Sequence, residues 1–554
     1  MAGVHDVLAA AVPDREMLVC GSIRRTYGEV AARTRSLAAF LAGHGLGARR
    51  ERSDLARWEC GQDTVAVVLY NGPEYIEAML GAFRARAVPF NVNQHYRPAE
   101  LGGLLTDLDT RGVVYHRALG PLVAEALPET IDTSDLVLID VDDGSGVVPL
   151  PGSTTFEDAA RTPVSRALPE TSPDDLYMVC TGGTTGRPKA VLWRQGDIYV
   201  SAMSGVAGAT GESIAAAATG NTGSRWYAVP PLMHAAAQWT AFSGLHTGST
   251  AVLHDDSGPF DARQILETAE REQVALMSIV GDAYARPFVA ELRRRSYDLG
   301  SLGILGTGGA ATSEANKEAL LDLVPHLTII DGYGASETGG MAFGARTRSN
   351  RPDAFTPSTG ADVVSADRSR FLEPGEDEIG WTARRGRVPL GYLGDRERTE
   401  ATFPIVDGER VAIPGDRAQR LADGGIRMLG RDAMVVNTGG EKVFVEEVEA
   451  VLVRHPDVTD ALVVGRPSER FGQEVVAVVA LRPGATVELA SLRDFVATDL
   501  ARFKAPRAVA VCDAVTRHAN GKADYRWAQE VALTATDATT PAGTTGATGA
   551  TGAR

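Results

Sequence analysis

Short apolar runs rich in β-branched residues alternate with helical patterns in the first third of the chain. Such runs occur at residues 65–70, 112–115 and 136–139, and a helical pattern occupies residues 73–85. Each run has the length of one strand, and this alternation is typical of parallel strands covered by helices. The sequence therefore predicts an α/β fold, with further α/β material over residues 195–338.

Changes of pattern further along the chain predict separate units. Residues 378–416 are rich in Gly, Arg and Thr and indicate a smaller β-rich region. Compact α+β material follows, with helices expected over 445–455 and from Ser491, and strands over 461–464 and 475–479. We predict a large N-terminal domain of layered α/β subdomains with a β-rich subdomain (1–431), a small mobile α+β domain (432–533) and a disordered tail (534–554). The two domains are expected to join at Asp432 and Ala433. Because no Pro/Gly/Ser spacer lies there, we expect a hinge and not a flexible linker.

Composition excludes several classes of function. At 554 residues the chain exceeds what one hydrophobic core supports. A net charge of −16 argues against nucleic acid as the main partner. The four cysteines are too scattered for a disulfide framework or a Cys-x-x-Cys metal site. No apolar run approaches a membrane span, and the first residues lack a secretion signal, so we expect a cytoplasmic protein.

A glycine-rich stretch, TGGTTGRPK at residues 181–189, follows the apolar run at 176–179. Glycines let the backbone approach an anion, threonine hydroxyls add donors, and the lysine adds charge. The ordinary P-loop is excluded because Pro188 and Ala190 flank the lysine. A surface turn uses the same residue types, so the alternative of a plain turn remains open. The phosphate-binding candidates are Thr181, Gly182, Gly183, Thr184, Thr185, Gly186 and Lys189.

Further motifs stand in a fixed order along the chain. They are PLMH at 231–234, DGYGASET at 331–338, PGDR at 414–417, GRD at 430–432, GGEKV at 439–443 and NGKADY at 520–525. Together with the glycine-rich stretch, they resemble the adenylate-forming superfamily of acyl-CoA synthetases, carrier-protein adenylation domains and luciferases over nearly the whole chain. Segments 58–63, 89–93 and 521–527 are similar to actinobacterial acyl-CoA synthetases for steroid, terpenoid or other alicyclic acids. The chain is also similar to the diterpenoid CoA ligases of platensimycin and platencin biosynthesis.

The resemblance implies an enzyme that joins a carboxylic acid to AMP from ATP, with Mg²⁺, and then transfers the acyl group to coenzyme A. Lys522 would stabilise the charge between acid and α-phosphate, and Glu337 would hold the metal ion. His234 would border the acid and open or close the tunnel for pantetheine. Rotation about the hinge would present first Lys522 and then the glycine motif at residue 439 to the acyl group.

The remaining positions follow from the same resemblance. Nucleotide contacts are expected from Gly309, Ala310, Asp331, Gly332, Tyr333, Ser336, Asp416 and Arg431, coenzyme A contacts from Gly439, Gly440, Glu441 and Lys442, and acyl contacts from His234, Gln238, Trp239, Gly306 and Thr307. Each has an ordinary structural alternative: an isolated lysine is usually a solvated surface group, a serine caps a helix, and a lone histidine packs in a core.

Three alanines depart from the family pattern. Ala190 ends the phosphate loop where glycine is usual, Ala235 follows His234 where glycine is common, and Ala433 occupies the hinge. An extra methyl in a packed site costs about 1–3 kcal/mol, so we expect slow adenylation, efficient thioester formation from a supplied acyl-adenylate, and a partner ligase that supplies it. Two other functions remain open: transfer to a carrier protein, and nucleotide binding without catalysis.

Overall fold

The computed structural model describes residues 1–127, 136–181, 189–352, 354–431, 434–438, 441–468, 471–518 and 522–537, with only the backbone at 431, 435, 437, 441, 442, 472, 536 and 537. It divides into two compact units. One comprises Met1–Pro414 and Gln419–Arg427, and the other Gly415–Ala418 and Met428–Arg554. The predicted hinge residues Asp432 and Ala433 and most of the predicted tail lie outside the described residues, so the predicted domain boundaries remain predictions.

The larger unit contains an eight-stranded sheet in the order β19-β9-β8-β4-β3-β5-β6-β7. Its strands are β3 (Thr64–Val68), β4 (Val88–Asn91), β5 (Thr110–His116), β6 (Val137–Val141), β7 (Thr154–Thr155), β8 (Leu176–Thr181), β9 (Lys189–Arg194) and β19 (Gly391–Tyr392). Strands β8, β4, β3, β5, β6 and β7 pair in parallel, whereas β9 runs antiparallel to both β8 and β19. The parallel strands predicted at 65–70, 112–115, 136–139 and 176–179 are therefore confirmed within a few residues.

A nine-stranded sheet forms the second layer of strands, in the order β16-β15-β14-β13-β12-β10-β11-β1-β2. Its strands are β1 (Glu16–Cys20), β2 (Ile23–Thr26), β10 (Arg225–Ala228), β11 (Thr250–Leu253), β12 (Leu276–Ile279), β13 (Ile304–Gly308), β14 (Thr328–Ala335), β15 (Gly339–Arg346) and β16 (Thr356–Pro357). The parallel run from β1 to β14 again agrees with the α/β prediction, and the edges at β2, β15 and β16 are antiparallel.

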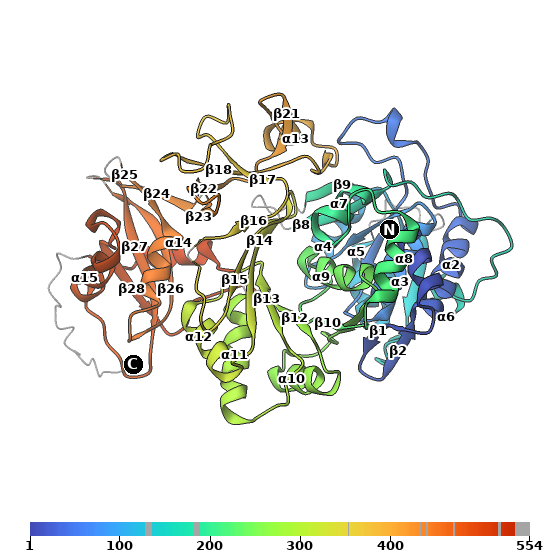
Figure 1. The fold of residues 1–554 in the computed structure, drawn as a ribbon, viewed down its shortest axis with the longest axis horizontal. Coiled ribbons are helices and arrows are strands. Elements are labelled where there is room, and N and C mark those ends of the chain that lie inside the picture. Colours follow the sequence, from blue (N-terminus) through green and yellow to red (C-terminus); the bar gives the residue numbers. More distant parts are fainter. Residues whose placement is uncertain are drawn as a thin grey trace, which may run out of the picture. The chain divides into compact units, whose positions relative to one another are not determined.

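Helices cover both sheets and separate them (Figure 1). They are α1 (Ala2–Ala11), α2 (Tyr27–Gly43), α3 (Pro73–Arg84), α4 (Pro98–Asp107), α5 (Gly120–Ala126), α6 (Phe156–Ala159), α7 (Gln195–Ala202), α8 (Gly211–Gly220), α9 (Ala235–His246), α10 (Ala262–Arg271), α11 (Gly281–Arg294), α12 (Glu314–Leu323) and α13 (Arg396–Thr402). One apolar core joins the two sheets through α2, α3 and α9. The outer faces are covered by α4 and α5 on one sheet and by α10, α11 and α12 on the other.

A third sheet contains the β-rich material predicted from residue 378 onward. Its order is β20-β21-β18-β22-β23, with β17 paired to β18. The strands are β17 (Ala361–Val364), β18 (Ile379–Arg385), β20 (Ile405–Val406), β21 (Glu409–Ala412), β22 (Asp416–Arg420) and β23 (Ile426–Arg431).

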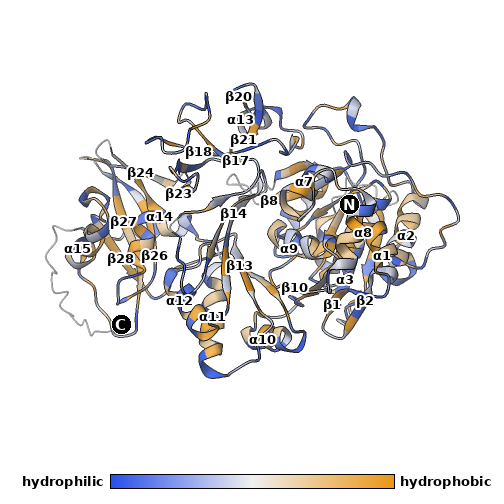
Figure 2. Ribbon diagram, in the orientation of Figure 1, coloured by the Kyte–Doolittle hydropathy of each residue, from blue (hydrophilic) through white to orange (hydrophobic). Residues whose placement is uncertain are grey.

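The smaller unit is an α+β sandwich around one sheet, β25-β24-β27-β28-β29, with β26 paired to β27. Its elements are β24 (Val435–Thr438), β25 (Glu441–Phe444), α14 (Val445–Leu452), β26 (Val458–Ser468), β27 (Gly472–Leu481), α15 (Leu489–Asp499), β28 (Ala508–Cys512), α16 (Tyr525–Ala532) and β29 (Thr536–Asp537). Helices α14 and α15 cover one face of the sheet and α16 covers the other. The central strands are apolar on both faces, as Figure 2 shows by colour, because both faces are buried.

The α/β prediction for the large domain and the α+β prediction for the small one are both confirmed. Among the residues that the structure describes, no helix is both long and apolar enough to cross a membrane.

Candidate active site

The two ends of the predicted phosphate loop lie opposite each other at the carboxyl end of β8. Thr181 is the last residue of β8, Lys189 is the first of β9, and the two form a register pair. Both are half-buried. The residues between them that we predict to bind phosphate, Gly182, Gly183, Thr184, Thr185 and Gly186, lie outside the described residues.

Asn91, at the end of β4, links the strand before this loop to the PLMH segment. Its Oδ1 accepts a hydrogen bond from the Cys180 amide (2.8 Å), while its Nδ2 donates to the carbonyls of Cys180 (2.8 Å) and Met233 (2.6 Å). Met233 directly precedes His234, so the amide of one side chain holds two predicted site segments together. Burial raises the pKa of the Cys180 thiol, which keeps it protonated and unreactive. Sequence analysis missed the role of Asn91, although the residue stands at the end of a buried strand.

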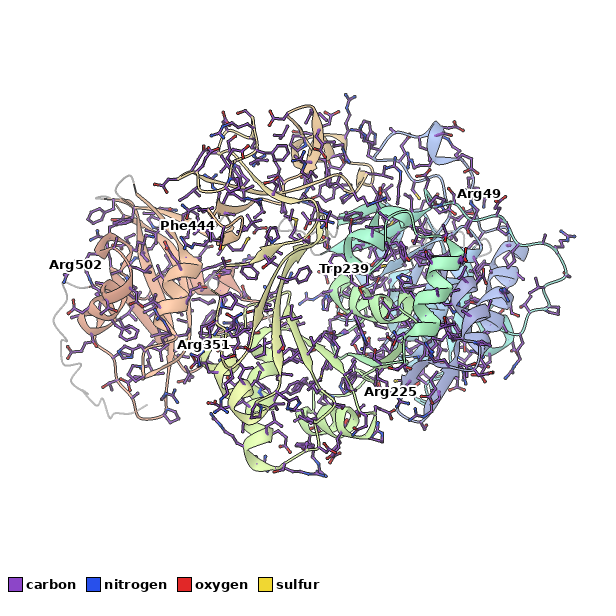
Figure 3. The ribbon with its side chains drawn as sticks, viewed as in Figure 1. Arg49, Arg225, Trp239, Arg351, Phe444 and Arg502 are labelled. Carbon is purple, nitrogen blue, oxygen red and sulfur yellow. The ribbon has the colours of Figure 1, made fainter. Side chains whose placement is uncertain are left out.

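His234 is the N-cap residue of α9, and Gln238 and Trp239 lie one turn further on. Gln238 is 2% exposed, accepts a hydrogen bond from the Tyr177 hydroxyl (2.7 Å) and donates to the Leu232 carbonyl (2.7 Å). These contacts hold Gln238 within the core, and its expected place in the acyl pocket remains a prediction. Trp239, labelled in Figure 3, is half-buried and packs against the core that joins the two sheets.

Register divides the predicted acyl residues of β13 between opposite faces of the sheet. Gly306 pairs with Ser278 on one side and Ile330 on the other, and all three are half-buried. Thr307 points to the other face, where it is 4% exposed and hydrogen-bonded to the Thr312 hydroxyl. Neighbouring residues of a strand face opposite ways, so Gly306 and Thr307 lie on opposite faces of the sheet, and their expected acyl contacts remain predictions.

The face that carries Gly306 also carries Gly308 and Gly332, which pair with each other across β13 and β14. A Cβ atom at Gly308 would lie 2.9 Å from the Gly332 carbonyl oxygen, so the strands require glycine there. The next residue, Gly309, has φ +74°, a conformation that favours glycine. Gly309, half-buried Ala310 and Gly332 are among the residues that we predict to contact the nucleotide.

The turn between β14 and β15 carries Ser336 and Glu337. The Trp193 indole of β9 donates to the Ser336 carbonyl (2.8 Å), and the Tyr392 hydroxyl of β19 donates to Glu337 Oε1 (2.7 Å). Tyr333 lies just before the turn, with its hydroxyl 3.2 Å from the Thr382 hydroxyl of β18. Strands from three sheets therefore fix the turn from several sides.

Asp331, at the start of the same motif, is held by a buried lysine. Lys317 Nζ lies 2.5 Å from Asp331 Oδ2, and Lys317 itself is 8% exposed. Burial raises the pKa of the Asp331 carboxyl, and the charge of Lys317 opposes that shift. The carboxyl is therefore paired with Lys317, and the nucleotide contacts expected of Asp331, Gly332 and Tyr333 remain predictions.

Glu337 is the candidate ligand for Mg²⁺. No cluster of three or more His, Cys, Asp or Glu side chains suited to a metal occurs in the part of the chain that the structure describes. One carboxylate is nevertheless what such a site needs, because Mg²⁺ keeps several waters and takes its other ligands from phosphates. The carboxylate of Glu337 is therefore a suitable protein ligand for Mg²⁺.

The other predicted site residues belong to the smaller unit. Asp416, 6% exposed, opens β22, and Arg431 ends the neighbouring strand β23. Lys522 is exposed. Glu441 and Lys442 form the start of β25 by their backbone, whereas Gly439 and Gly440 lie outside the described residues.

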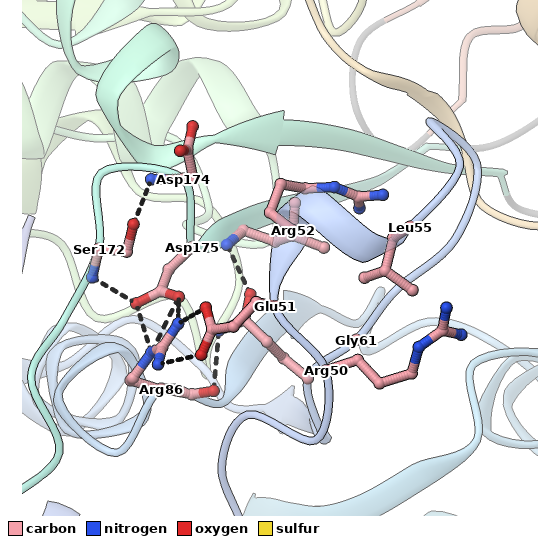
Figure 4. Close-up of a pocket in the computed structure, with 11 residues that line it drawn as sticks. Arg50, Glu51, Arg52, Leu55, Gly61, Arg86, Ser172, Asp174 and Asp175 are labelled. Atoms are coloured by element: carbon pink, nitrogen blue, oxygen red, sulfur yellow. Dashed lines mark hydrogen bonds and ion pairs between the residues drawn. The ribbon is translucent and has the colours of Figure 1, made fainter.

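A shallow pocket lies elsewhere, before β8 begins (Figure 4). Arg86 fills one side of it and donates to Glu51 and Asp175 at 2.8 and 2.9 Å. This pocket is at the opposite end of β8 from Thr181, and its charges neutralise each other. It is therefore separate from the predicted site.

Comparison with known proteins agrees with this arrangement. The AMP-binding enzyme family model matches residues 6–380, and the model of its C-terminal domain matches residues 447–522. The medium-chain acyl-CoA ligase Mig of Mycobacterium avium is 44% identical over 545 residues, covering 96% of this chain and 98% of that protein. The medium/long-chain-fatty-acid–CoA/3-oxocholest-4-en-26-oate–CoA ligase of Mycobacterium tuberculosis H37Rv is 38% identical over 536 residues, with 94% of each covered.

A solved structure, the anthranilate CoA ligase AuaEII with anthranoyl-AMP, shares the fold. It has a TM-score of 0.78 and 21% identity, and the likeness covers 96% of this chain and 98% of that one. The family models, the two relatives and this fold agree over nearly the full length of both units. The chain therefore belongs to the AMP-binding enzyme family and is an AMP-forming acid–thiol ligase.

Proposed function

We propose that the chain activates a bulky alicyclic carboxylic acid as its acyl-adenylate and transfers the acyl group to coenzyme A. The observation that carries the acid class is the half-buried backbone of β13 at Gly306, on the same face as Gly332, which we predict to contact the nucleotide. The relative named for 3-oxocholest-4-en-26-oate, a ring-containing acid, supports the same class.

A Cβ atom would have ordinary van der Waals neighbours at Gly306 and Gly332, whereas the sheet leaves no room for one at Gly308. A Cβ atom at Gly306 would lie 3.8 Å from the Met277 carbonyl oxygen and 4.0 Å from the Ser278 Cβ, and one at Gly332 would meet nothing closer than 3.6 Å. Because Gly306 has no side chain, the wall is lower there and leaves room for a wide group. A rigid ring system needs such a wall, whereas a straight chain fits a narrow channel.

The first half-reaction needs charge stabilisation more than a general base. An oxygen of the acid attacks the α-phosphorus of ATP, and the bond to pyrophosphate breaks. Lys522 supplies the positive charge, and Glu337 carries the metal ligand, with one oxygen engaged by Tyr392. Mg²⁺, when bound, would neutralise phosphate charge and polarise the phosphoryl group.

In the second half-reaction, the thiolate of coenzyme A attacks the acyl carbon and the bond to AMP breaks. We place His234 beside that carbon and the Glu441–Lys442 segment along pantetheine. Since Lys522 and this segment belong to the same small unit, the proposal includes the rotation about the hinge that uses them in turn. It predicts that AMP changes the rate of proteolysis at Asp432 and Ala433.

The burial of Ala190 argues against the expected weakness of adenylation. Ala190 is 6% exposed and packs in the core cluster that includes Cys180, Met178 and Leu192. The methyl group of Ala190 is therefore accommodated by the packing of the core. Adenylation of the chain's acid at about 1 s⁻¹ or faster would contradict both that weakness and the need for a partner ligase.

A second candidate acid is a straight medium-length chain, favoured by the 44% identity to the medium-chain ligase Mig. The assignment to platensimycin or platencin biosynthesis stays a prediction that rests on resemblance. Transfer to a carrier protein also remains open, and offering coenzyme A and a holo carrier separately tests it.

The experiment that separates the two acid classes uses two acids of equal carbon number, adamantane-1-carboxylic acid and undecanoic acid. Gly306→Ala adds a methyl that meets no protein atom closer than 3.8 Å, so it should fold normally. A methyl group in a packed site should raise the KM for the adamantyl acid by roughly fivefold or more. The KM for undecanoic acid should rise by less than about twofold.

Gly303→Ala is the matched control, because its Cβ also meets nothing closer than 4.0 Å but lies before β13 begins. It should change neither KM. The proposed acid class would be wrong if the unmodified protein preferred undecanoic acid by tenfold, or if Gly306→Ala left both acids unaffected.

A further inference from the structure

The segment that carries Lys522 is one side of a short antiparallel hairpin. The amide of His518 donates to the Lys522 carbonyl (2.8 Å), and the amide of Asp524 donates to the Thr516 carbonyl (3.3 Å). Arg517 and Ala523 form the bridge between these two bonds. The backbone of Lys522 is therefore held at the last pair of the hairpin before residues 519–521, while its side chain is exposed.

One side of the hairpin is anchored by an ion pair. Arg517 donates from Nη2 to Asp460 Oδ1 (2.8 Å) and from Nε to Asp460 Oδ2 (3.1 Å). Asp460 belongs to β26 and is 9% exposed. A paired, two-bond contact between a guanidinium and a carboxylate fixes orientation as well as distance.

The other side is anchored by Tyr525, three residues after Lys522 and the first residue of α16. Its hydroxyl lies 3.0 Å from Glu449 Oε2, and the other oxygen, Oε1, accepts a hydrogen bond from the Val463 amide (2.7 Å). In the described sheet β26 pairs only with β27, so alternate amides of β26 need partners elsewhere. Glu449 thus joins α14, β26 and α16 at one point.

We propose that Tyr525 and Glu449, together with the Arg517–Asp460 pair, are positioning residues that hold the hairpin so that Lys522 reaches the acid and the α-phosphate. This rests on the proposed function of Lys522. A lysine side chain has four rotatable bonds, so placing its ammonium group costs conformational entropy. A backbone that is already fixed lowers that cost. Side chains on β26 and α14 hold the backbone of the hairpin in place.

The proposal affects one half-reaction only. Lys522 stabilises charge while pyrophosphate departs, and it has no part when the thiolate displaces AMP. Glu449 stands on α14, which directly follows the Glu441–Lys442 strand β25. A merely structural role for Glu449 would therefore disturb both half-reactions.

The test uses the full chain and measures the half-reactions separately. Step one is pyrophosphate release with ATP and whichever of the adamantyl or undecanoic acids is turned over faster. Step two is thioester formation from the synthetic adenylate of that acid. Tyr525→Phe removes one hydroxyl, and loss of one such hydrogen bond should slow step one by roughly threefold to tenfold and change step two by less than twofold.

Two further variants change the same contact in graded ways. Glu449→Gln keeps an acceptor for the Val463 amide and a polar partner for Tyr525, so step one should stay within about twofold of the unmodified rate. Glu449→Leu removes both and should slow step one at least as much as Tyr525→Phe.

Glu474→Gln is the matched control in the same unit. Glu474 Oε1 lies 2.7 Å from Arg466 Nη2, and Arg466 holds the other end of α16 through the carbonyls of Ala532 and Ala535. The control should lower the melting temperature without a selective change in step one. An equal loss of both steps in Tyr525→Phe, no loss at all, or the same selective loss in Glu474→Gln would overturn the proposal.

Lys522→Ala, measured beside these variants, separates the two levels of inference. Selective loss of step one in Lys522→Ala but not in Tyr525→Phe overturns only the positioning role. If Lys522→Ala spares step one, the proposed function of the lysine is wrong and the positioning role is overturned with it.

Discussion

Glu337 and Lys522, the two charged residues assigned to the first half-reaction, are held in different ways. The Glu337 turn lies between two strands of a nine-stranded sheet and is fixed by hydrogen bonds from Trp193 and Tyr392. The Lys522 hairpin has one bridge of its own and depends on two side-chain contacts at its base. The difference teaches that the Glu337 turn is held by its own two strands together with side chains of a neighbouring sheet, whereas the Lys522 hairpin depends mainly on pairs of polar side chains.

The largest effect is expected from Lys522→Ala. Loss of one preorganised charge at a developing anion typically costs about 10²–10³ in rate, and this loss should fall on adenylation. Thioester formation from the supplied adenylate should stay within about threefold, because the lysine has no role in it. Pyrophosphate release and thioester formation, measured separately, check this. Equal loss of both steps would contradict the assignment.

The next effect concerns the turn held by strands. Glu337→Gln should slow adenylation by roughly tenfold to a hundredfold and raise the Mg²⁺ concentration needed for half-maximal rate, because an amide is a weaker ligand than a carboxylate. Tyr392→Phe removes only the hydrogen bond to Glu337 and should have a smaller effect of the same kind. A titration with Mg²⁺ in each variant tests this. The comparison fails if Lys522→Ala shifts the Mg²⁺ requirement as much as Glu337→Gln does.

The smallest effect is on stability as a function of pH. Burial, the largest cause, and the charge of Glu446 raise the pKa of Glu449 from 4.5 to about 8, while the Val463 amide, Tyr525 and Arg517 oppose the shift. The folded protein then holds a proton between these pH values that the unfolded chain has lost. The stabilisation is full below about pH 4.5 and declines as the pH rises to about 8.

Glu449→Gln removes this titration. Denaturant unfolding at several pH values should show the free energy of unfolding of the unmodified protein falling relative to that of Glu449→Gln as the pH rises from 4.5 to 8, with no further change above that range. Parallel stability curves for the two proteins would show that the carboxyl of Glu449 does not titrate as the structure indicates.

Local sequence patterns predicted most of the elements. The helix expected at 73–85 is α3 (Pro73–Arg84), and the strand expected at 475–479 lies within β27 (Gly472–Leu481). Both elements are buried almost throughout, so the composition and length of the local apolar run predict them, not an alternation of buried and exposed positions. The helix expected at 445–455 is shorter, ending at Leu452.

Residues whose roles depend on distant partners could not be predicted in this way. Gln238 is held by Tyr177 and Tyr75, which lie 61 and 163 residues away in the chain. The face on which Thr307 lies depends on how β13 pairs with its neighbours, and a shift of one residue would reverse it. The contact between Tyr525 and Glu449 spans 76 residues, so no local pattern reports it.

The three glycines on β13 and β14 have a consequence for how enzymes of this kind diverge. Where a wall consists of backbone, a single nucleotide change can add one methyl or hydroxymethyl group without moving a strand. At Gly306, where the nearest atoms are 3.8 and 4.0 Å away, the fold tolerates such a change, whereas at Gly308 the 2.9 Å approach of Gly332 forbids it. On the acid class that we propose, a change at Gly306 would alter the preferred acid in small steps, while Gly308 stays fixed by the packing of the sheet.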